Sequence, residues 1–506
     1  MARFLLIFSF YPKLIFSQEV WNSMPPISFP NTEITDMITD NDTVVMYGTG
    51  FNNNFEWKQG LVIAKLDSNG TVLQEKIILD ALGDKLAVSE RWGKIINTSD
   101  GGYIATAAPV IRKSAMLIKF DNELNISFIK EYVDSTLISN FWYTPREVKN
   151  GYLLYGTQQF PDLKIVGFVK YVDYQGEVIW EKRFSHTPFT NTVSDLQLLS
   201  DSTFVFLTQE TTDPGNSSQL GTSRSGIYKI NLNGEVTSFW QSPNSPTTGY
   251  MLRAMPLLGG DVITYGVARK SVTQFGTELI QPTMTRFDTN FNVVWTYNFG
   301  KITSSGSARH LQKFTKTLDE NYVGVGTYFV KTGTDVSRGH GWIYKFSAEG
   351  DSLWGRTFPT PLLPDEYPNG GILYGAGILS SGNIMAGGLA EDGQNRYCWL
   401  VKITNDGCMD TLFCQTSDIY SHETGDNKIS IYPNPANDQI HINASDGIRK
   451  IVMFDSWNRI VNQKQLNGVT NFDLPITDKI PDGVYFLKLI DSNNTEYIKK
   501  IVVSKF

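Results

Sequence analysis

The residue types that most often carry chemistry are sparse in this sequence and form no familiar catalytic or metal-binding pattern. The five histidines are His186, His310, His340, His422 and His441. No two of them have a spacing that zinc sites use. The sequence also has neither a Gly-x-Ser-x-Gly nucleophile elbow nor a Gly-x4-Gly-Lys-Ser/Thr phosphate loop. We therefore expect no metal and no cofactor.

The three cysteines lie close together in the last third of the chain. Cys408 and Cys414 are near enough to close a small disulfide loop in an oxidising compartment. Cys398 lies in an apolar strand pattern, so we expect it to be a core residue.

The composition describes a globular, exported protein. With 506 residues and 41% hydrophobic content the chain can bury large cores. The formal net charge is -7 and we find no basic patch, which argues against a nucleic-acid partner. Residues 1–17 combine one early positive charge with a short, interrupted apolar run. This pattern predicts a signal peptide, with a buried first strand as the alternative, and it is too short for a transmembrane span.

A hairpin pattern recurs along most of the chain. In its clearest copy an apolar strand ends at Lys345-Phe346, a turn closes on Gly350, and a return strand leads to Trp354. Seven turns align with this copy, at residues 65–70, 119–124, 171–176, 229–234, 286–291, 345–350 and 402–407.

A second apolar run precedes each hairpin, and another short segment with a tight turn precedes that run. Each repeat therefore holds four strands. Packed radially, seven such units would cover one another's apolar faces. The sequence predicts an all-β fold in which residues 30–415 form a seven-bladed β-propeller. An array of β-sandwiches or a β-helix is the rival interpretation, and the repeat length disfavours the β-helix.

Tryptophans follow several of the repeated turns. We expect Trp180, Trp295 and Trp354 to pack between blades. The turn and tryptophan of Asp173-x-x-Gly176-x-x-x-Trp180 resemble the tryptophan-docking repeats of quinoprotein propellers, although the spacing here is one residue shorter. That resemblance implies a blade and not a quinone cofactor. Turns such as Asp67 to Gly70 need no calcium, because an aspartate at that position stabilises the turn itself.

Loop lengths point to one face of the predicted propeller. The connections from the second to the third strand, and from the fourth strand to the next repeat, contain all the long segments, such as 210–225, 270–281, 328–339 and 358–371. Long loops commonly carry function on a rigid scaffold. We therefore predict a ligand site on that face, near the channel mouth, formed by Arg91, Trp92, Trp142, Tyr250, His310 and Tyr374. Ordinary rim packing is the alternative for the same residues.

The last 79 residues form a separate unit. Residues 416–427 are polar and predict a linker. Residues 428–506 alternate as a small antiparallel β-sandwich. Within them Ile431-Tyr-Pro433-Asn434-Pro435-Ala436, then Val452 to Asp455, then Gly483-Val-Tyr485-Phe-Leu-Lys488, and finally Lys499-Lys500-Ile-Val-Val503 occur in order.

This unit resembles the type A C-terminal sorting domain of the type IX secretion system. The resemblance implies that the chain is cargo, that its sorting signal includes Pro433, Asn434, Pro435, Gly483, Tyr485, Lys488, Lys499 and Lys500, and that its partner is the type IX machinery. It also implies passage through the periplasm to the outer cell surface or the medium. Asn458 departs from the family, which commonly has glycine there.

Three functions fit this organisation. The favoured one is a binding or adhesion module that presents one loop-rich face to a glycan or a protein. A secreted propeller enzyme acting on glycans or esters is the alternative, because paired carboxylates facing a channel could perform acid–base chemistry. A purely structural surface protein is the third.

Overall fold

The computed structural model describes most of the chain. The described residues are 20–28, 31–51, 60–88, 94–162, 164–184, 189–212, 223–243, 250–272, 278–298, 303–304, 310–332, 336–361, 370–392, 395–408, 429–433, 436–455, 460–477, 480–492 and 496–503. The chain divides into two compact units, Met1–Thr411 and Leu412–Phe506. Within the described ranges there is no helix, and so none that could cross a membrane.

The first unit consists of antiparallel sheets that we number in chain order. Sheet 1 is β2 (Asn31–Asp40), β3 (Thr43–Phe51), β4 (Gly60–Leu66) and β5 (Val72–Ile78). Sheet 2 is β6 (Leu86–Ala87), β7 (Ile95–Asn97), β8 (Tyr103–Pro109), β9 (Ala115–Phe120) and β10 (Ile126–Tyr132). Sheet 3 is β11 (Ser139–Trp142), β12 (Arg146–Val148), β13 (Gly151–Gln159), β14 (Ile165–Val172) and β15 (Val178–Phe184). Sheet 4 is β16 (Phe189–Ser200), β17 (Thr203–Thr212), β18 (Ser223–Asn231) and β19 (Val236–Gln241).

Three more sheets complete this unit among the described residues. Sheet 5 is β20 (Tyr250–Pro256), β21 (Val262–Val272), β22 (Glu278–Phe287), β23 (Val293–Asn298) and the short β24 (Thr303–Ser304). Sheet 6 is β25 (His310–Lys316), β26 (Tyr322–Thr332), β27 (Val336–Phe346) and β28 (Ser352–Phe358). Sheet 7 is β29 (Gly370–Ile378), β30 (Ile384–Glu391), β31 (Arg396–Ile403) and β1 (Trp21–Ser23).

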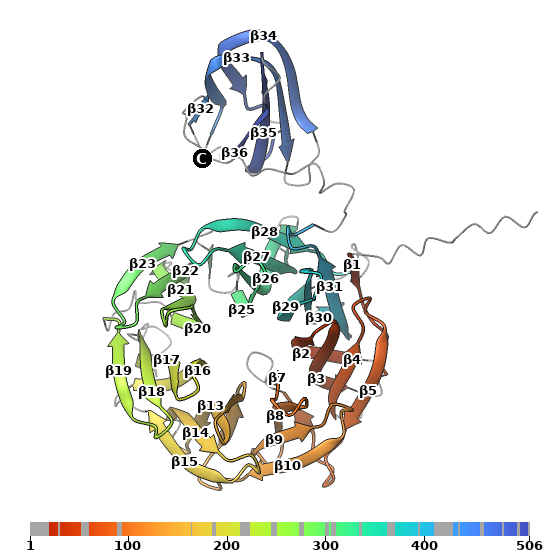
Figure 1. Ribbon diagram of the computed structural model, residues 1–506, viewed down its shortest axis with the longest axis vertical. Coiled ribbons are helices and arrows are strands. Elements are labelled where there is room, and N and C mark those ends of the chain that lie inside the picture. Colours follow the sequence, from red (N-terminus) through yellow and green to blue (C-terminus); the bar gives the residue numbers. More distant parts are fainter. Residues whose placement is uncertain are drawn as a thin grey trace, which may run out of the picture. The chain divides into compact units, whose positions relative to one another are not determined.

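The sheets stand in a ring around a central space, with β2, β7, β16, β20, β25 and β29 nearest to it (Figure 1). Sheet 7 packs directly on sheet 1 through β29 and β2. The cores lie between neighbouring sheets, where buried side chains of both sheets meet. Ile63 of sheet 1 and Ile118 of sheet 2, for example, belong to one core cluster.

The repeated turns have the geometry that their residues require. Gly70, Gly176, Gly234, Gly350 and Gly407 all have positive φ, between 74° and 90°, where a side chain would be strained. The aspartate that opens such a turn is used by the turn itself. The Asp67 Oδ1 atom, for instance, accepts the backbone N–H groups of Asn69 and Thr71 at 2.9 and 2.8 Å.

Tryptophans and basic residues join six of the seven sheets to the turn of the next sheet, as the sequence predicts for the tryptophans. The indole N–H groups of Trp180 and Trp354 donate to the carbonyls of Leu232 and Asn405, at 2.8 and 3.2 Å. The ring of Trp295 lies against Gly350 so closely that a β-carbon there would come within 2.9 Å of it.

A Lys or Arg of the third strand makes a second link of the same kind. Such links are Lys65 to Asn122, Lys229 to Thr289, Arg286 to Ala348, Lys345 to Asn405 and Lys402 to Ser68. The last of these joins sheet 7 to sheet 1.

The ring closes through the beginning of the chain. Strand β1 pairs with β31, with Trp21 opposite Lys402, and supplies the outermost strand of sheet 7. The structure therefore adds residues N-terminal to position 30 to the predicted propeller region. The indole of Trp21 is buried and lies against Gly70 in sheet 1. It lies against this turn glycine as Trp295 lies against Gly350 and Trp354 against Gly407.

Replacing Trp21 should consequently loosen the closure between the two ends of the ring. We expect Trp21→Ala to lower the free energy of unfolding by about 3–5 kcal/mol, the usual cost of deleting a buried tryptophan. Equilibrium denaturant unfolding measures the change. Leu73→Ala is the control, because Leu73 on β5 is 60% exposed and its loss should cost less than about 0.5 kcal/mol. Equal effects of the two substitutions would contradict the closure.

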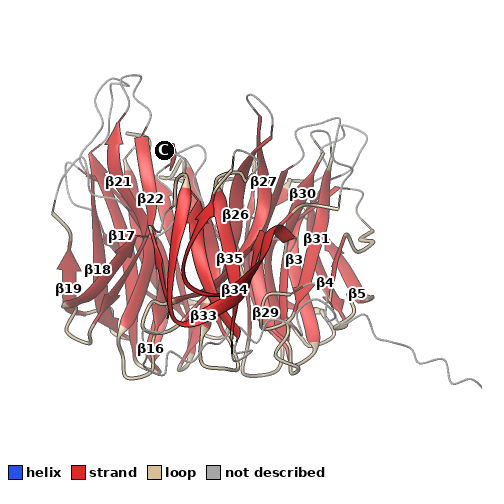
Figure 2. Cartoon of the chain, turned by 90° about the horizontal axis from the view of Figure 1, so that it is seen from above, coloured by secondary structure: helices blue, strands red, loops and turns tan. Residues whose placement is uncertain are grey.

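Two predicted loops are mainly extended hairpins instead. Strands β21 and β22 stay paired to Val272 opposite Glu278, and β26 and β27 stay paired to Thr332 opposite Val336. These strands carry the sheets well beyond the level at which the shorter sheets end (Figure 2). Segments 270–281 and 328–339, which were expected to be irregular loops, therefore consist largely of paired strand residues.

The second unit is built on one hydrogen-bonded set of five strands. They are β32 (Ile429–Tyr432), β33 (Gln439–Asp455), β34 (Ile460–Pro475), β35 (Gly483–Asp491) and β36 (Glu496–Val503). The sequence predicts two short strands where the single long β33 runs, and it does not predict β34. Side chains from all five strands contact one core, including Ile440, Leu474, Leu487 and Ile501.

The cysteines have two different environments. Cys398 is a free thiol in the core between sheets 7 and 1, as predicted, and burial raises its pKa. Cys408 is disulfide-bonded. Its predicted partner, Cys414, lies outside the described residues.

Candidate functional site

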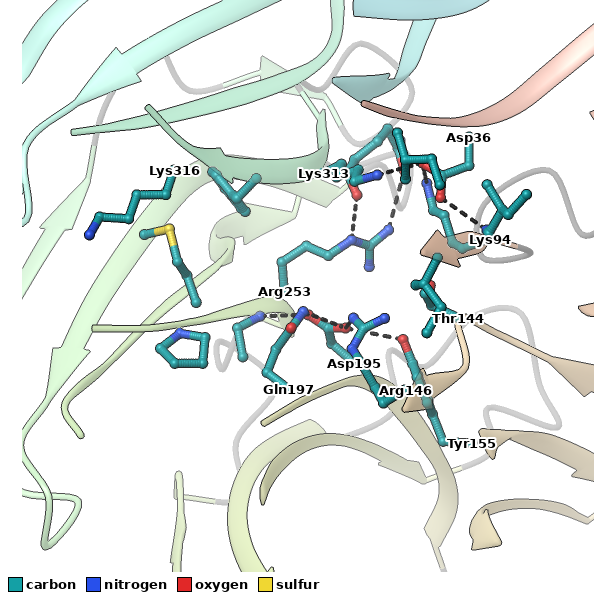
Figure 3. Close-up of a pocket in the computed structure, with 18 of the residues that line it drawn as sticks. Asp36, Lys94, Thr144, Arg146, Tyr155, Asp195, Gln197, Arg253, Lys313 and Lys316 are labelled. Atoms are coloured by element: carbon teal, nitrogen blue, oxygen red, sulfur yellow. Dashed lines mark hydrogen bonds and ion pairs between the residues drawn. The ribbon is translucent and has the colours of Figure 1, made fainter. Parts of the chain in front are cut away.

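The candidate site is a cavity of about 480 Å³ in the central space of the ring. Side chains of the innermost strands of sheets 1 to 6 line it (Figure 3). On each strand the lining runs from mid-strand toward the tight turn that follows, as from Asp36 to Ile38 on β2 and from Arg253 to Pro256 on β20. The cavity therefore lies toward the face of the short turns, opposite the loop-rich face that the sequence favoured.

A repeated irregularity aims side chains at this cavity. Five innermost strands contain a β-bulge at the same level, and the residue after it is Asp36, Asp195, Arg253, Lys313 or Gly375. In sheets 2 and 3 the inner strand is interrupted at that level, at Lys94 and Thr144. A bulge turns a side chain away from the regular alternation of a strand. We call these seven residues the channel ring.

Asp36 contacts two other members of the channel ring, Lys94 and Lys313. Its carboxylate is 1% exposed. Oδ1 accepts the backbone N–H of Met37 at 2.8 Å and the ammonium of Lys313 at 2.9 Å. Oδ2 accepts the N–H of Ile95 in the next sheet at 3.2 Å. The Lys94 ammonium lies 3.9 Å from Oδ1.

Asp195 repeats this arrangement across the channel. It accepts the N–H of the following residue, Leu196, at 2.9 Å and that of Ala254 in the next sheet at 2.8 Å. The hydroxyl of Tyr155 donates to Oδ1 at 3.1 Å, and the Arg146 guanidinium lies 3.7 Å away. Both aspartates therefore tie neighbouring inner strands together, and both act as hydrogen-bond acceptors.

Lys94 is a buried cation whose surroundings do not favour its charge. It is 5% exposed, and its ammonium donates to the carbonyls of Thr35 and Tyr374 at 3.2 and 3.0 Å. The pKa of Lys94 is lowered to about 7, chiefly by burial and also by the positive charges of Lys313 and Arg253, while Asp36 and Asp195 oppose the shift.

Arg253 lies between the two aspartates, with the group around Asp36 on one side and the group around Asp195 on the other (Figure 3). Its guanidinium is 8% exposed and donates to the carbonyls of Leu252 and Gln312, both at 2.6 Å. Burial lowers the pKa of Arg253. Carbonyl dipoles fix the orientation of this side chain in the cavity.

The rest of the lining offers shape and an apolar surface. Ile38, Met255, Pro256 and Phe314 line the cavity toward the tight turns. Lys316 also lines it and forms an ion pair with Glu320. The lining thus combines charged residues at the channel ring with apolar residues nearer the tight turns, and such a mixture of polar and apolar groups is usual in ligand cavities.

Three of the six residues predicted as a ligand site, Trp142, Tyr250 and Tyr374, have described side chains, and none of these three is among those that line this cavity. Trp142 is 4% exposed and packs between sheets 2 and 3, with its ring 4.6 Å from that of Tyr132 and the Lys170 ammonium 5.1 Å away. Its indole N–H donates to Asn140 at 2.7 Å. This environment is that of a packing residue. Tyr250 begins β20 and packs against Val267.

Of the other four residues, Tyr374 is the one whose side chain the structure describes. Tyr374 is buried, and its carbonyl holds Lys94. His310 begins β25 opposite Thr327, and its side chain lies outside the described part of the chain. Arg91 and Trp92 also lie outside the described residues.

The channel ring had a signal in the sequence that we did not use. Asp36, Lys94, Asp195, Arg253 and Lys313 are ionisable residues one or two repeats apart, each a few residues before a tight turn and each directly followed by an apolar residue. Ionisable residues are unusual at repeated positions of buried strands. The prediction was based instead on aromatic and polar residues at the strand entrances.

The predicted sorting residues lie in the second unit. Tyr485 on β35 is buried, and its hydroxyl donates to the carbonyl of Pro481 at 2.7 Å. Pro433 follows β32, Gly483 and Lys488 are on β35, and Lys499 and Lys500 are on β36. Asn434 and Pro435 lie outside the described residues.

The comparison with known families confirms the predicted sorting domain. Residues 430–504 match the family described as secretion system C-terminal sorting domain. The chain therefore carries a C-terminal sorting domain, which supports secretion by the type IX system and export to the cell surface or the medium. No curated protein sequence matches the chain.

Several solved structures are distantly similar. Semaphorin 2a of Drosophila has 9% identity and a TM-score of 0.43, over 96% of this chain and 97% of that one. An α-L-arabinofuranosidase of Fusarium graminearum has 12% identity and a TM-score of 0.39, over 63% and 94%. A mannose phosphorylase of Leishmania mexicana has 10% identity and a TM-score of 0.32, over 52% and 82%. We base no function on likenesses this distant.

Proposed function

We propose that this protein is a secreted or surface-exposed seven-bladed β-propeller, exported as type IX cargo, that binds a ligand in the cavity of its central channel. The seven sheets of the first unit correspond to the blades, and β1 completes the seventh. Residues 1–17 act as the export signal, 416–427 as the linker, and 428–506 as a small β-sandwich for sorting. The partners are the type IX machinery and a ligand of the channel.

One observation carries the binding role. Six of the seven channel-ring residues line one cavity, and five of these six have ionisable side chains instead of the apolar ones that would fill a channel. Buried charges cost stability unless they are compensated. A structural channel needs no such ring, so this arrangement supports a binding site.

Binding fits the geometry better than catalysis does. Asp36 and Asp195 are held as acceptors by backbone N–H groups and cations, whereas a glycosidase pair needs one carboxyl group that donates a proton. One observation favours the alternative, a secreted enzyme acting on glycans or esters. Lys94 has a pKa of about 7, and such a value suits proton transfer.

A ligand array tests the proposal. The full chain is applied to arrays of glycans and matrix proteins beside two variants, Arg146→Glu in the cavity and Arg183→Glu on the outer strand β15, where Arg183 pairs with Glu181 and Asp134. We expect selective hits that the first variant loses and the second retains. If the Arg146→Glu variant still bound the same ligands, the binding site would not lie in the channel. If the protein hydrolysed a glycan or an ester, the enzyme alternative would be established.

A further inference from the structure

We propose that the channel cavity recognises a neutral polyhydroxylated ligand, such as one hexose unit of a glycan, through two glutamine amides of fixed orientation. This inference rests on the proposed function, because it names the class of ligand that the same site would take. Its evidence comes from Gln197 and Gln312, which line the cavity from β16 and β25. One of these amides offers a hydrogen-bond acceptor and the other offers a donor.

The carboxylate of Asp195 fixes the amide of Gln197 (Figure 3). The Nε2 atom of Gln197 donates to both carboxylate oxygens, at 3.3 and 3.1 Å. Because a carboxylate only accepts hydrogen bonds, the NH₂ group of the amide and not its carbonyl must face Asp195. The Oε1 atom of Gln197 therefore faces away from Asp195, and none of the described residues donates to it. The lining thus holds an acceptor of fixed direction.

Arg253 fixes the amide of Gln312 in the opposite sense. Its guanidinium donates to the backbone carbonyl of Gln312 at 2.6 Å and to the Oε1 atom of the same residue at 3.4 Å. Because a guanidinium only donates hydrogen bonds, the amide carbonyl and not the NH₂ group must face it. The Nε2 atom of Gln312 faces away, and within the described part of the chain it has no acceptor. The lining therefore holds a fixed donor as well.

Arg146 adds further donors beside the amide of Gln197. Its guanidinium donates to the carbonyl of Pro145 at 3.0 Å and lies 3.7 Å from Asp195, which is too far for a hydrogen bond. Most N–H groups of this side chain therefore have no acceptor among the described residues. Since Gln197 and Arg146 both lie next to the carboxylate of Asp195, an acceptor and several donors occur together in one corner of the cavity.

This corner suits a neutral polyol better than it suits an ion. An anion would lie against Asp195 and the amide oxygen of Gln197, and a cation would lie against Arg146. A hydroxyl group both donates and accepts, so neighbouring hydroxyls of a sugar can bond to Gln197 and to Arg146 at once. Met255 and Phe314 in the lining suit the C–H face of a sugar ring, and a cavity of about 480 Å³ is of ordinary size for a small ligand.

The test compares neutral and charged hexoses on the full chain. Calorimetric titrations use glucose, galactose and mannose, the acidic glucuronate and the basic glucosamine. We expect at least one neutral hexose to bind more tightly than both charged sugars. Gln197→Leu and Gln312→Leu each remove one hydrogen bond without changing the charge, and each should weaken binding roughly 5- to 30-fold. Gln175→Leu is the matched control, because Gln175 is exposed in a turn outside the lining and should leave the affinity unchanged.

Deoxy sugars then show whether Gln197 contacts the ligand directly. Each monodeoxy derivative of the tightest hexose is titrated against the unaltered protein and against Gln197→Leu. One derivative should bind the unaltered protein less tightly than its parent sugar, and this difference should vanish in Gln197→Leu, because the hydroxyl and its partner are lost together. If Gln197 only supported the fold, the variant would weaken the parent sugar and every derivative equally.

The outcomes separate this inference from the proposed function. Thermal unfolding first establishes that each variant is folded. Tighter binding of a charged sugar, no binding of any neutral hexose, or binding that both glutamine variants retain would overturn the polyol inference. If the array then showed a ligand that Arg146→Glu loses and Arg183→Glu retains, the proposed function would stand while this inference fell.

Discussion

Deletion of residues 428–506 is expected to leave the propeller in the periplasm. The sorting domain lies within this segment, at residues 430–504, and its strands form a core of their own. The preceding unit is compact by itself, so the truncated protein should fold and lose only its route across the outer membrane. Near-complete loss of the surface and extracellular fractions should accompany accumulation in the periplasm.

Cell fractionation of a tagged protein measures this effect. The complementary experiment attaches residues 416–506 to an unrelated periplasmic reporter, which should then reach the outer surface or the medium. Thermal unfolding of the purified truncated protein shows whether the propeller is intact. Surface delivery of the truncated form at the normal level would contradict the role of the domain.

Substitution of Asp36 by alanine is expected to destabilise the propeller more than any other change in the channel. The carboxylate accepts N–H groups from two inner strands and faces Lys94 and Lys313. Its removal leaves these cations buried and uncompensated and two backbone donors without their acceptor. Breaking a buried ion pair in this way costs about 3–5 kcal/mol.

Denaturant unfolding provides the measurement, with two further variants for comparison. Asp406→Ala removes an exposed aspartate in the last repeated turn and should change stability by less than about 0.5 kcal/mol. Asp36→Asn keeps an oxygen that can accept one N–H and should fall between the two. If Asp36→Ala unfolded at the same denaturant concentration as Asp406→Ala, the channel ring would not be the structural hub that its contacts indicate.

The repeated parts of the fold could be predicted because their causes are local. A turn such as Asp67 to Gly70 requires φ > 0 at its glycine, and Trp354 follows its turn by a fixed number of residues. Local sequence therefore locates the hairpins and the residues that link neighbouring sheets. Strand β1 could not be found this way, because its partner β31 lies more than 370 positions away and only the closure of the ring pairs them.

The candidate site escaped prediction for a different physical reason. A strand alternates its side chains between two faces, and a bulge shifts that alternation by one residue. The bulge before Asp36, repeated before Asp195 and Arg253, is what brings these charges into the channel. Sequence shows the charges but not the bulges, so it cannot tell which residues face the cavity. The aromatic residues chosen instead include Trp142, which is packed between sheets.

A structure of the full chain determined with the strongest ligand from the array would test the central claim most directly. The account predicts density for that ligand in the channel cavity, within hydrogen-bonding distance of lining side chains such as Arg146 or Lys313. A ligand bound elsewhere, with the cavity unchanged, would contradict it.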